Sequence, residues 1–178
     1  MNDTKSMIKN ALILFAITLV AGVLLGLVYQ VTKDPIAYQE KLAQDKANQS
    51  VFASAQTFED VALDASGTVL GYVIQVKSKG YGDFITYTVG ITNESSINGI
   101  SIIKIAETPG LGMNAEKVLV PQFVDKAASA LTVAKSGQVT DANSQIEAIS
   151  GATITSRAVT NGVNAAVSYF ENVLKGGQ

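Results

Sequence analysis

The hydroxyl-rich stretch Ser150-Gly151-Ala152-Thr153-Ile154-Thr155 is the part of the sequence whose residue types best suit the binding of a phosphate group. A short apolar segment precedes it and predicts a strand end, whereas the apolar residues after it recur at helical intervals. The start of a helix offers unpaired backbone N–H groups and a partial positive charge, which favour a phosphate even without a basic side chain. We therefore predict that this strand-to-helix loop holds a phosphate or is bonded to one.

A simpler interpretation is that Thr153 or Thr155 only caps the final helix, because hydroxyl residues are common helix caps. The hexapeptide taken alone favours this simpler interpretation, since short motifs have many false matches. The motifs in the rest of the chain shift the balance towards a phosphate site.

The composition excludes several classes of site. The sequence contains no Cys and no His, so the usual ligands of iron–sulfur clusters, most haems and most zinc sites are missing. Nucleophilic catalysis by Ser–His or Cys–His pairs is excluded for the same reason. The net charge of −2 gives no basic field for nucleic acid. We expect no catalytic group and no metal site, and any redox role would need an organic cofactor.

Residues 10–32 contain no charged residue, and this run is long enough to span the apolar core of a bilayer. We predict a transmembrane helix there, preceded by a short N-terminal segment at 1–9. A cleaved signal peptide and a buried soluble helix are the alternatives, but the run is longer than a typical signal core and no clear cleavage site follows it. Lysines lie on both sides of the run, so charge alone does not orient it.

Residues 33–50 are polar and predict a juxtamembrane helical spacer, in which Asp34 caps a new helix and Pro35 occupies its first turn. The domain proper is expected at 51–178. Strands are predicted at 68–76, 84–92 and 100–106, with a turn at 79–83 and a second turn at Asn98-Gly99. In the strand at 84–92, one alternating set of apolar residues should face a core.

The loop 107–112 has the sequence Glu-Thr-Pro-Gly-Leu-Gly, and its proline and glycines allow a backbone shaped as a wall for a flat ligand. A helix that Pro121 interrupts or restarts is predicted over 115–129, followed by polar turns at 137–143 and a final helix. Its buried face should comprise Val159, Val163, Ala166, Val167, Phe170, Val173 and Leu174. The predicted fold class is α+β, with one membrane anchor, an antiparallel sheet and flanking helices.

With these loops identified, nearly the whole chain resembles the flavin-binding subunits of ion-pumping respiratory complexes. These are the G subunit of the Rnf complex and its relative, the C subunit of the sodium-translocating NADH:quinone reductase. The resemblance includes the N-terminal span with the segment 32–37, the turn at 80–82, the loop at 107–112, and Ser150 to Thr153. The last two, in this order and spacing, are specific.

The resemblance implies that FMN is bonded through its phosphate to Thr153, by a separate flavin transferase that takes FMN from FAD with the help of a metal ion. This agrees with the residues, since a threonine hydroxyl is a weak nucleophile without a base and the chain offers no histidine. Glu147 stands where the family usually has Asp. The cofactor-binding residues implied beside Thr153 are Ser150, Gly151, Ala152, Thr155, Glu107, Thr108, Gly110, Leu111, Gly112, Tyr81 and Gly82. Thr155 or Ser156 could donate a hydrogen bond to the phosphate.

The size of the chain favours the Rnf protein over the quinone-reductase protein. The resemblance implies an electron-carrier subunit of an ion-translocating ferredoxin:NAD oxidoreductase, without a complete active site of its own. The expected partners are the other Rnf subunits, the flavin transferase and the membrane, with the C-terminal domain on the extracytoplasmic side of the cytoplasmic membrane. The alternatives are the quinone-reductase protein, a tethered structural or binding subunit without a cofactor, and an enzyme that binds free FMN reversibly.

Overall fold

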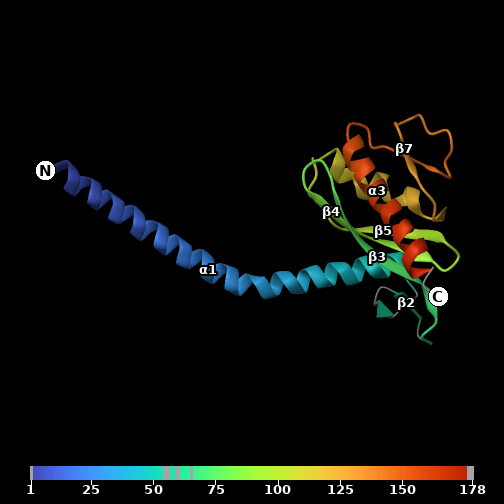
Figure 1. The fold of residues 1–178 in the computed structure, drawn as a ribbon, viewed down its shortest axis with the longest axis horizontal. Helices are drawn as coiled ribbons and strands as arrows, with labels where there is room; N and C mark the ends of the chain where they lie inside the picture. Colours follow the sequence, from blue (N-terminus) through green and yellow to red (C-terminus); the bar gives the residue numbers. More distant parts are fainter. Residues whose placement is uncertain (1, 54–56, 59–60, 65, 176–178) are drawn as a thin grey trace. The chain divides into compact units, whose positions relative to one another are not determined.

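The computed structural model describes residues 2–53, 57–58, 61–64 and 66–175. The chain divides into two compact units, Met1–Leu42 and Ala43–Gln178. The first unit is helical throughout its described part, and the second contains a sheet, a long C-terminal helix and the end of the N-terminal helix (Figure 1).

The N-terminal helix α1 runs from Asn2 to Val51, and it contains one segment apolar enough to cross a membrane, with a mean hydropathy of 2.8. The large apolar side chains of this segment are exposed, as expected for a surface that lipid covers. The expected helix start at Asp34 is wrong, because α1 continues through Pro35 without a break. Because proline has no N–H, the helix passes this point without the main-chain bond from residue 35 to Val31 O.

Among the described residues, six strands form an antiparallel sheet whose spatial order follows the chain. The long central strands are β3 (Val69–Lys79), β4 (Phe84–Thr92) and β5 (Ser96–Lys104), flanked by β1 (Thr57–Phe58), β2 (Val61–Leu63) and β6 (Lys126–Ala127). The strand predicted at 84–92 is confirmed, and its alternating residues Ile85, Tyr87, Val89 and Ile91 are fully buried. The turn between β3 and β4 therefore lies at 80–83, as predicted.

The turn predicted at Asn98-Gly99 is wrong. The chain turns earlier, at residues 93–95, where Ser95 takes a φ of 58°. Asn98 and Gly99 lie inside β5 at a register shift: Gly90 pairs with Gly99, but Ile91 pairs with Ile97. The extra residue forms a bulge, and Gly99 accepts a φ of 153° that the bulge imposes. The Asn98 side chain donates from Nδ2 to the carbonyl of Val51.

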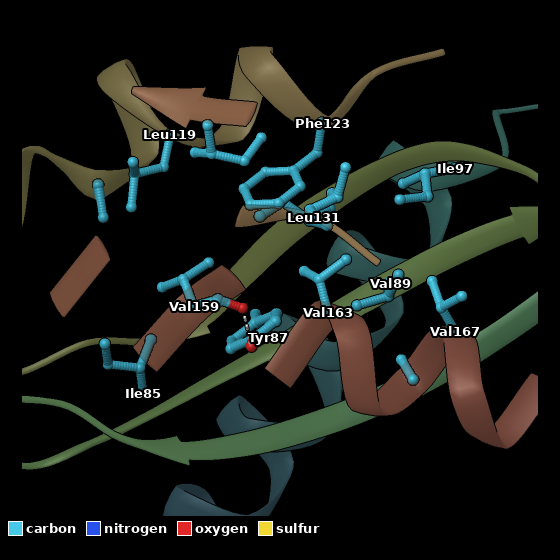
Figure 2. Close-up of a cluster of buried hydrophobic side chains, with 14 of the residues drawn as sticks. Ile85, Tyr87, Val89, Ile97, Leu119, Phe123, Leu131, Val159, Val163 and Val167 are labelled. Carbon is cyan, nitrogen blue, oxygen red and sulfur yellow. Dashed lines mark hydrogen bonds between the residues drawn. The ribbon is translucent and has the colours of Figure 1, made fainter. Parts of the chain in front are cut away.

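The C-terminal helix α3 (Thr153–Tyr169) continues as a π-helical turn, η3 (Phe170–Leu174), and covers one face of the sheet along β3 and β4. Figure 2 shows Val159, Val163 and Val167 of α3 packed towards Tyr87 and Val89 of β4. The Tyr87 hydroxyl donates to Val159 O at 2.8 Å. Gly162 permits this close packing, because a Cβ atom there would lie 2.0 Å from the Tyr87 hydroxyl oxygen. Of the predicted buried face only Val173 is wrong, since it is 51% exposed.

The segment 112–129 is less helical than predicted. It contains the short elements η1 (Gly112–Asn114), α2 (Ala115–Val118) and η2 (Val120–Phe123), and the chain then becomes extended in β6. Pro121 lies at the start of η2, so it begins a tight turn instead of interrupting a longer helix. The side chains of Leu119 and Phe123 close the core on this side. A parallel pair, β7 (Thr132–Ala134) with β8 (Gln145–Glu147), leads into α3.

The last turn of α1 packs on the opposite face of the sheet. Val51 and Phe52 form a small second core with Ala62 and Val73. Two glycines make room for it, since a Cβ atom at Gly71 would lie 2.6 Å from Cζ of Phe52, and one at Gly90 would lie 2.9 Å from Cβ of Val51. The two faces of the sheet are thus covered by α3 and by the end of α1.

Candidate functional site

Helix α3 begins at Thr153 without a side-chain cap. Ala152, the residue before it, has φ −131° and ψ 45°, and within the described residues no side chain caps the N–H groups of the first turn. Gly151 adopts a φ of 76°, which a residue with a side chain rarely accepts, and so turns the chain sharply into the helix. The first N–H groups of α3 are therefore available to an anion. The interpretation that Thr153 or Thr155 only caps this helix is wrong.

The hydroxyls of the hexapeptide and of the next residue have different surroundings. Thr155 is 1% exposed, and its hydroxyl donates to Oε2 of Glu107 at 2.6 Å. Ser156 is fully buried; its Oγ donates to Ala152 O at 3.0 Å and accepts from the N–H of Ile149 at 3.0 Å. Thr153 is half-buried, and within the described part of the chain its hydroxyl has no hydrogen-bond partner. Of these three, the Thr153 hydroxyl is the one still open to a ligand; Ser150 is exposed as well, but it does not line the cavity beside the helix start.

A cavity of about 550 Å³ lies directly beside this helix start. Its volume falls in the range of small-molecule and cofactor sites. Three loops supply its wall: the β3–β4 turn, the loop 107–112 and the first turn of α3. The lining residues are Tyr81, Glu107, Thr108, Leu111, Gly151, Ala152, Thr153, Ile154 and Thr155.

The structure therefore brings together most of the residues expected at the site. Ser150, Gly82, Gly110 and Gly112 do not line the cavity. Gly110 instead shapes the loop, with a φ of 76° and its carbonyl bonded to the side chain of Asn114 at 2.8 Å. The sequence motifs did not identify Ile154, which is 55% exposed at the cavity. Its position off the apolar stripe of α3, directly after Thr153, is the signal that could have identified it.

The lining combines apolar and charged surfaces. Tyr81 and Leu111 are 68% and 40% exposed, so they offer apolar area to a flat ligand. Glu107 is only 7% exposed and supplies a carboxylate. Within the described residues, no group of three or more His, Cys, Asp or Glu side chains could hold a metal ion.

Glu147, at the position where Asp was expected, is half-buried and holds a neighbouring turn. Its Oε1 accepts from the N–H of Gly137 and from the Ser136 hydroxyl, both at 2.8 Å. These two donors, the Gly137 amide first, lower the pKa of the Glu147 carboxyl from its usual value. The N–H of Glu147 donates to Oε1 of Gln122, and the carbonyl of Glu147 accepts from Nε2 of Gln122. Glu147 therefore fixes the strand that leads to the site and does not itself line the cavity.

Comparisons of the fold find two solved structures with the same arrangement. They are NqrC of Shewanella oneidensis, with a TM-score of 0.56 and 24% identity, and the C subunit of the Na(+)-translocating NADH-quinone reductase of Parabacteroides distasonis, with a TM-score of 0.51 and 24% identity. The matches cover 65% and 62% of this chain, and 59% and 58% of those chains. At this identity they establish the shared fold.

Comparisons of the sequence are more specific. A family profile described as "FMN-binding domain" matches residues 80–168, and one described as "RnfG N-terminal region" matches residues 1–51. The G subunit of the Na(+)-translocating ferredoxin:NAD(+) oxidoreductase complex of Acetobacterium woodii is 35% identical, over 97% of this chain and 96% of its own length. The proton-translocating counterpart of Clostridium ljungdahlii is 36% identical over 83% of each chain. The chain belongs to the family of G subunits of ion-translocating oxidoreductase (Rnf) complexes.

Proposed function

We propose that this chain is the membrane-anchored flavoprotein subunit of an Rnf complex and that it relays electrons through FMN bonded by a phosphoester to Thr153. The observation that carries the proposal is the uncapped start of α3, where a half-buried threonine hydroxyl opens on the cavity of about 550 Å³. The helix start suits the phosphate, and the exposed faces of Tyr81 and Leu111 suit the ring. When bound, FMN supplies reversible electron transfer, and the protein supplies attachment and orientation.

Attachment requires a second protein. In the proposed step, Thr153 Oγ1 forms a bond to the phosphorus of the FMN half of FAD, the pyrophosphate bond breaks, and AMP leaves. The hydroxyl proton must pass to a base, and the sequence contains no histidine. Among the residues at the cavity, Glu107 is a carboxylate already occupied by the Thr155 hydroxyl. A separate flavin transferase is therefore the expected source of that base and a further partner of this protein.

The decisive substitution is Thr153→Ala, made in cells that contain the transferase. We expect the fluorescent flavin band on a denaturing gel to disappear, because the attacking oxygen is gone, while the domain stays folded. The measurement is in-gel fluorescence together with the intact mass of the purified chain. The wild-type chain should weigh more than its amino acids by FMN less one water.

Thr108→Ala is the matched control, because Thr108 also lines the cavity but belongs to another loop. It should keep the added mass. Full labelling of the Thr153→Ala chain would refute the attachment site. Flavin that remains in the supernatant after acid precipitation would instead indicate an enzyme that binds FMN reversibly, and a colourless wild-type chain made with the transferase would indicate a structural subunit.

The side of the membrane occupied by residues 43–178 is also part of the proposal. The family resemblance supports the extracytoplasmic side, and the lysines that flank the apolar run do not oppose either orientation. Protease added to intact spheroplasts should digest the C-terminal domain if it lies outside the cytoplasm. Digestion only after the membrane is opened would place the domain on the cytoplasmic side and refute this part of the proposal.

A further inference from the structure

The carboxylate of Glu107 joins the three loops that line the cavity. Its Oε1 accepts from the N–H of Gly82 at 3.0 Å, and its Oε2 accepts from the N–H of Tyr81 at 3.3 Å and from the Thr155 hydroxyl at 2.6 Å. The donors lie 25, 26 and 48 residues away along the chain. Glu107 itself stands at the start of the loop 107–112, so a single side chain contacts every wall of the site.

The glycines of two of these loops make room for this side chain. A Cβ atom at Gly80 would lie 2.3 Å from Oε1 of Glu107, and one at Gly112 would lie 2.7 Å from its Cβ and 2.8 Å from Oγ1 of Thr155. These distances are too short for real atoms, so neither position accepts a side chain without movement of its neighbours. Neither glycine lines the cavity. Their role is therefore to enclose the Glu107 side chain, and a ligand is not needed to explain them.

From this geometry we infer that Glu107 is a positioning residue. Its carboxylate fixes the β3–β4 turn, the loop 107–112 and the first turn of α3 relative to one another before any flavin is attached. Thr155 is a positioning residue as well, because its hydroxyl bonds Glu107 and so positions the helix turn that carries Thr153. The arrangement of the loops is a property of the chain alone; its use in flavin attachment rests on the function proposed above.

A carboxylate is the side-chain group that suits this position, because it has acceptors on both oxygens and no donor. In Glu107→Gln one oxygen becomes an NH₂ group, which cannot accept from a backbone N–H. If the NH₂ group replaces Oε1 it meets the Gly82 N–H, and if it replaces Oε2 it meets the Tyr81 N–H. One backbone bond is lost in either orientation. Hydrogen bonds to charged groups are stronger than neutral ones, so the loss should be measurable.

The test is amide hydrogen exchange, measured by mass spectrometry on the full-length protein in detergent, made without the transferase. We expect Glu107→Gln to accelerate exchange in peptides that contain Tyr81 and Gly82 by about tenfold or more. Glu147→Gln is the matched control, since that carboxylate accepts from the N–H of Gly137 and from a serine hydroxyl. Both donors meet Oε1 of Glu147, so the amide oxygen of glutamine can keep both bonds, and this variant should leave exchange at Gly137, Tyr81 and Gly82 nearly unchanged.

A second pair of variants keeps the test decisive if Glu107→Gln does not fold. Thr155→Ser retains the hydroxyl, whereas Thr155→Val retains the shape of the threonine and removes the donor. If Thr155 acts through its bond to Glu107, the serine variant should protect the first turn of α3 as the wild type does, and the valine variant should exchange faster. Equal protection in both variants, or unchanged exchange at Tyr81 and Gly82 in a folded Glu107→Gln chain, would overturn the inference.

Two separate measurements test the positioning role of Glu107 and the attachment of flavin at Thr153. Flavin attachment at Thr153 is judged by the added mass of the chain, and the positioning role of Glu107 is judged by exchange in a chain without flavin. With the transferase present, Glu107→Gln should slow the appearance of the added mass while leaving the final stoichiometry near that of the wild type. An unchanged rate of attachment combined with faster exchange would limit the role of Glu107 to the conformation of the loops.

Discussion

Tyr87 connects the sheet to the C-terminal helix through one buried hydroxyl. The side chain is fully buried, and its hydroxyl donates to Val159 O at 2.8 Å. Only the protonated phenol can make this bond. Removal from water raises the pKa of Tyr87 well above its usual value of 10.0, because burial disfavours the phenolate.

The raised pKa of Tyr87 predicts a loss of stability in alkali. The unfolded chain releases the phenolic proton near pH 10, whereas the folded chain retains it, so the free energy of unfolding should fall as the pH rises above about 10. In Tyr87→Phe this part of the alkaline decrease should be absent, although the variant is less stable at neutral pH by about 1 kcal/mol through the lost hydrogen bond. Urea unfolding at pH 7 and pH 10.5 measures both effects. An equal alkaline decrease in the two proteins would contradict the assignment.

The family resemblance singled out Thr153 as the expected attachment residue, whereas the residue types alone do not separate the hydroxyls of the motif. Thr153 and Thr155 are two residues apart and have the same side chain. They differ because Thr155 meets Glu107, which is 48 residues away, inside the fold. The glycines of the loop 107–112 were likewise interpreted as shaping a wall for a flat ligand, whereas Gly112, together with Gly80, encloses the Glu107 side chain. Such distant contacts leave no local signal in one sequence.

At the scale of elements, the sheet has one face for α3 and another for the end of α1. The contact with the end of α1 depends on Gly71 and Gly90, over which Val51 and Phe52 pack. It also includes a hydrogen bond from the Thr88 hydroxyl to Oδ1 of Asn48, at 3.2 Å. Thr88 is fully buried although it points away from the main core. The end of α1 is therefore a structural part of the domain as well as the link to the apolar segment.

This packing predicts that Gly71→Ala destabilises the domain. The new Cβ atom would lie 2.4 Å from Ile91 O and 2.6 Å from Cζ of Phe52, so a strand or the helix end must move. Overpacking of this kind costs about 1–3 kcal/mol. Gly22→Ala is the control, because nothing lies within 4 Å of a Cβ atom there. Thermal unfolding in detergent should show a lower midpoint for Gly71→Ala alone, and equal midpoints would contradict the packing.

The elements with long regular patterns were predicted well, and those set by local irregularities were not. The alternation in 84–92 and the helical periodicity after Thr153 each extend over several residues and so identify β4 and α3. Asn98-Gly99 has the composition of a turn, yet the pairing of Gly90 with Gly99 makes it a bulge inside β5. Pro35 has the composition of a helix start, yet it lies within α1. In both cases the neighbours of the motif decide its structure.

At the scale of the whole molecule, the chain combines an apolar helix with a domain that contains the candidate site. The apolar run at 10–32 has no charged side chain, and its large residues are exposed. Membership in the family of subunits of an ion-translocating complex agrees with a membrane anchor. This helix is long and apolar enough to anchor the domain at a membrane.

This anchoring predicts that an alkaline carbonate wash leaves the protein in the membrane pellet. In the double variant Val20→Arg with Leu24→Arg, each arginine near the centre of the span opposes insertion by about 2.5–3.5 kcal/mol, so a large fraction should be released or fail to insert. Gln39→Arg, placed after the apolar run, should behave as the wild type. The measurement is the amount of protein in pellet and supernatant, and retention of the double variant would contradict the assigned span.

Along the described sheet, β2 pairs with β3 only within residues 69–72, and β6 pairs with β5 only at Ser96 and Ile97. Among the described strands, the rest of β3 and of β5 therefore has β4 as its one neighbour. A strand with one neighbour can take up an added strand through its main-chain groups. These two stretches are consequently where a neighbouring polypeptide can extend the sheet of this domain.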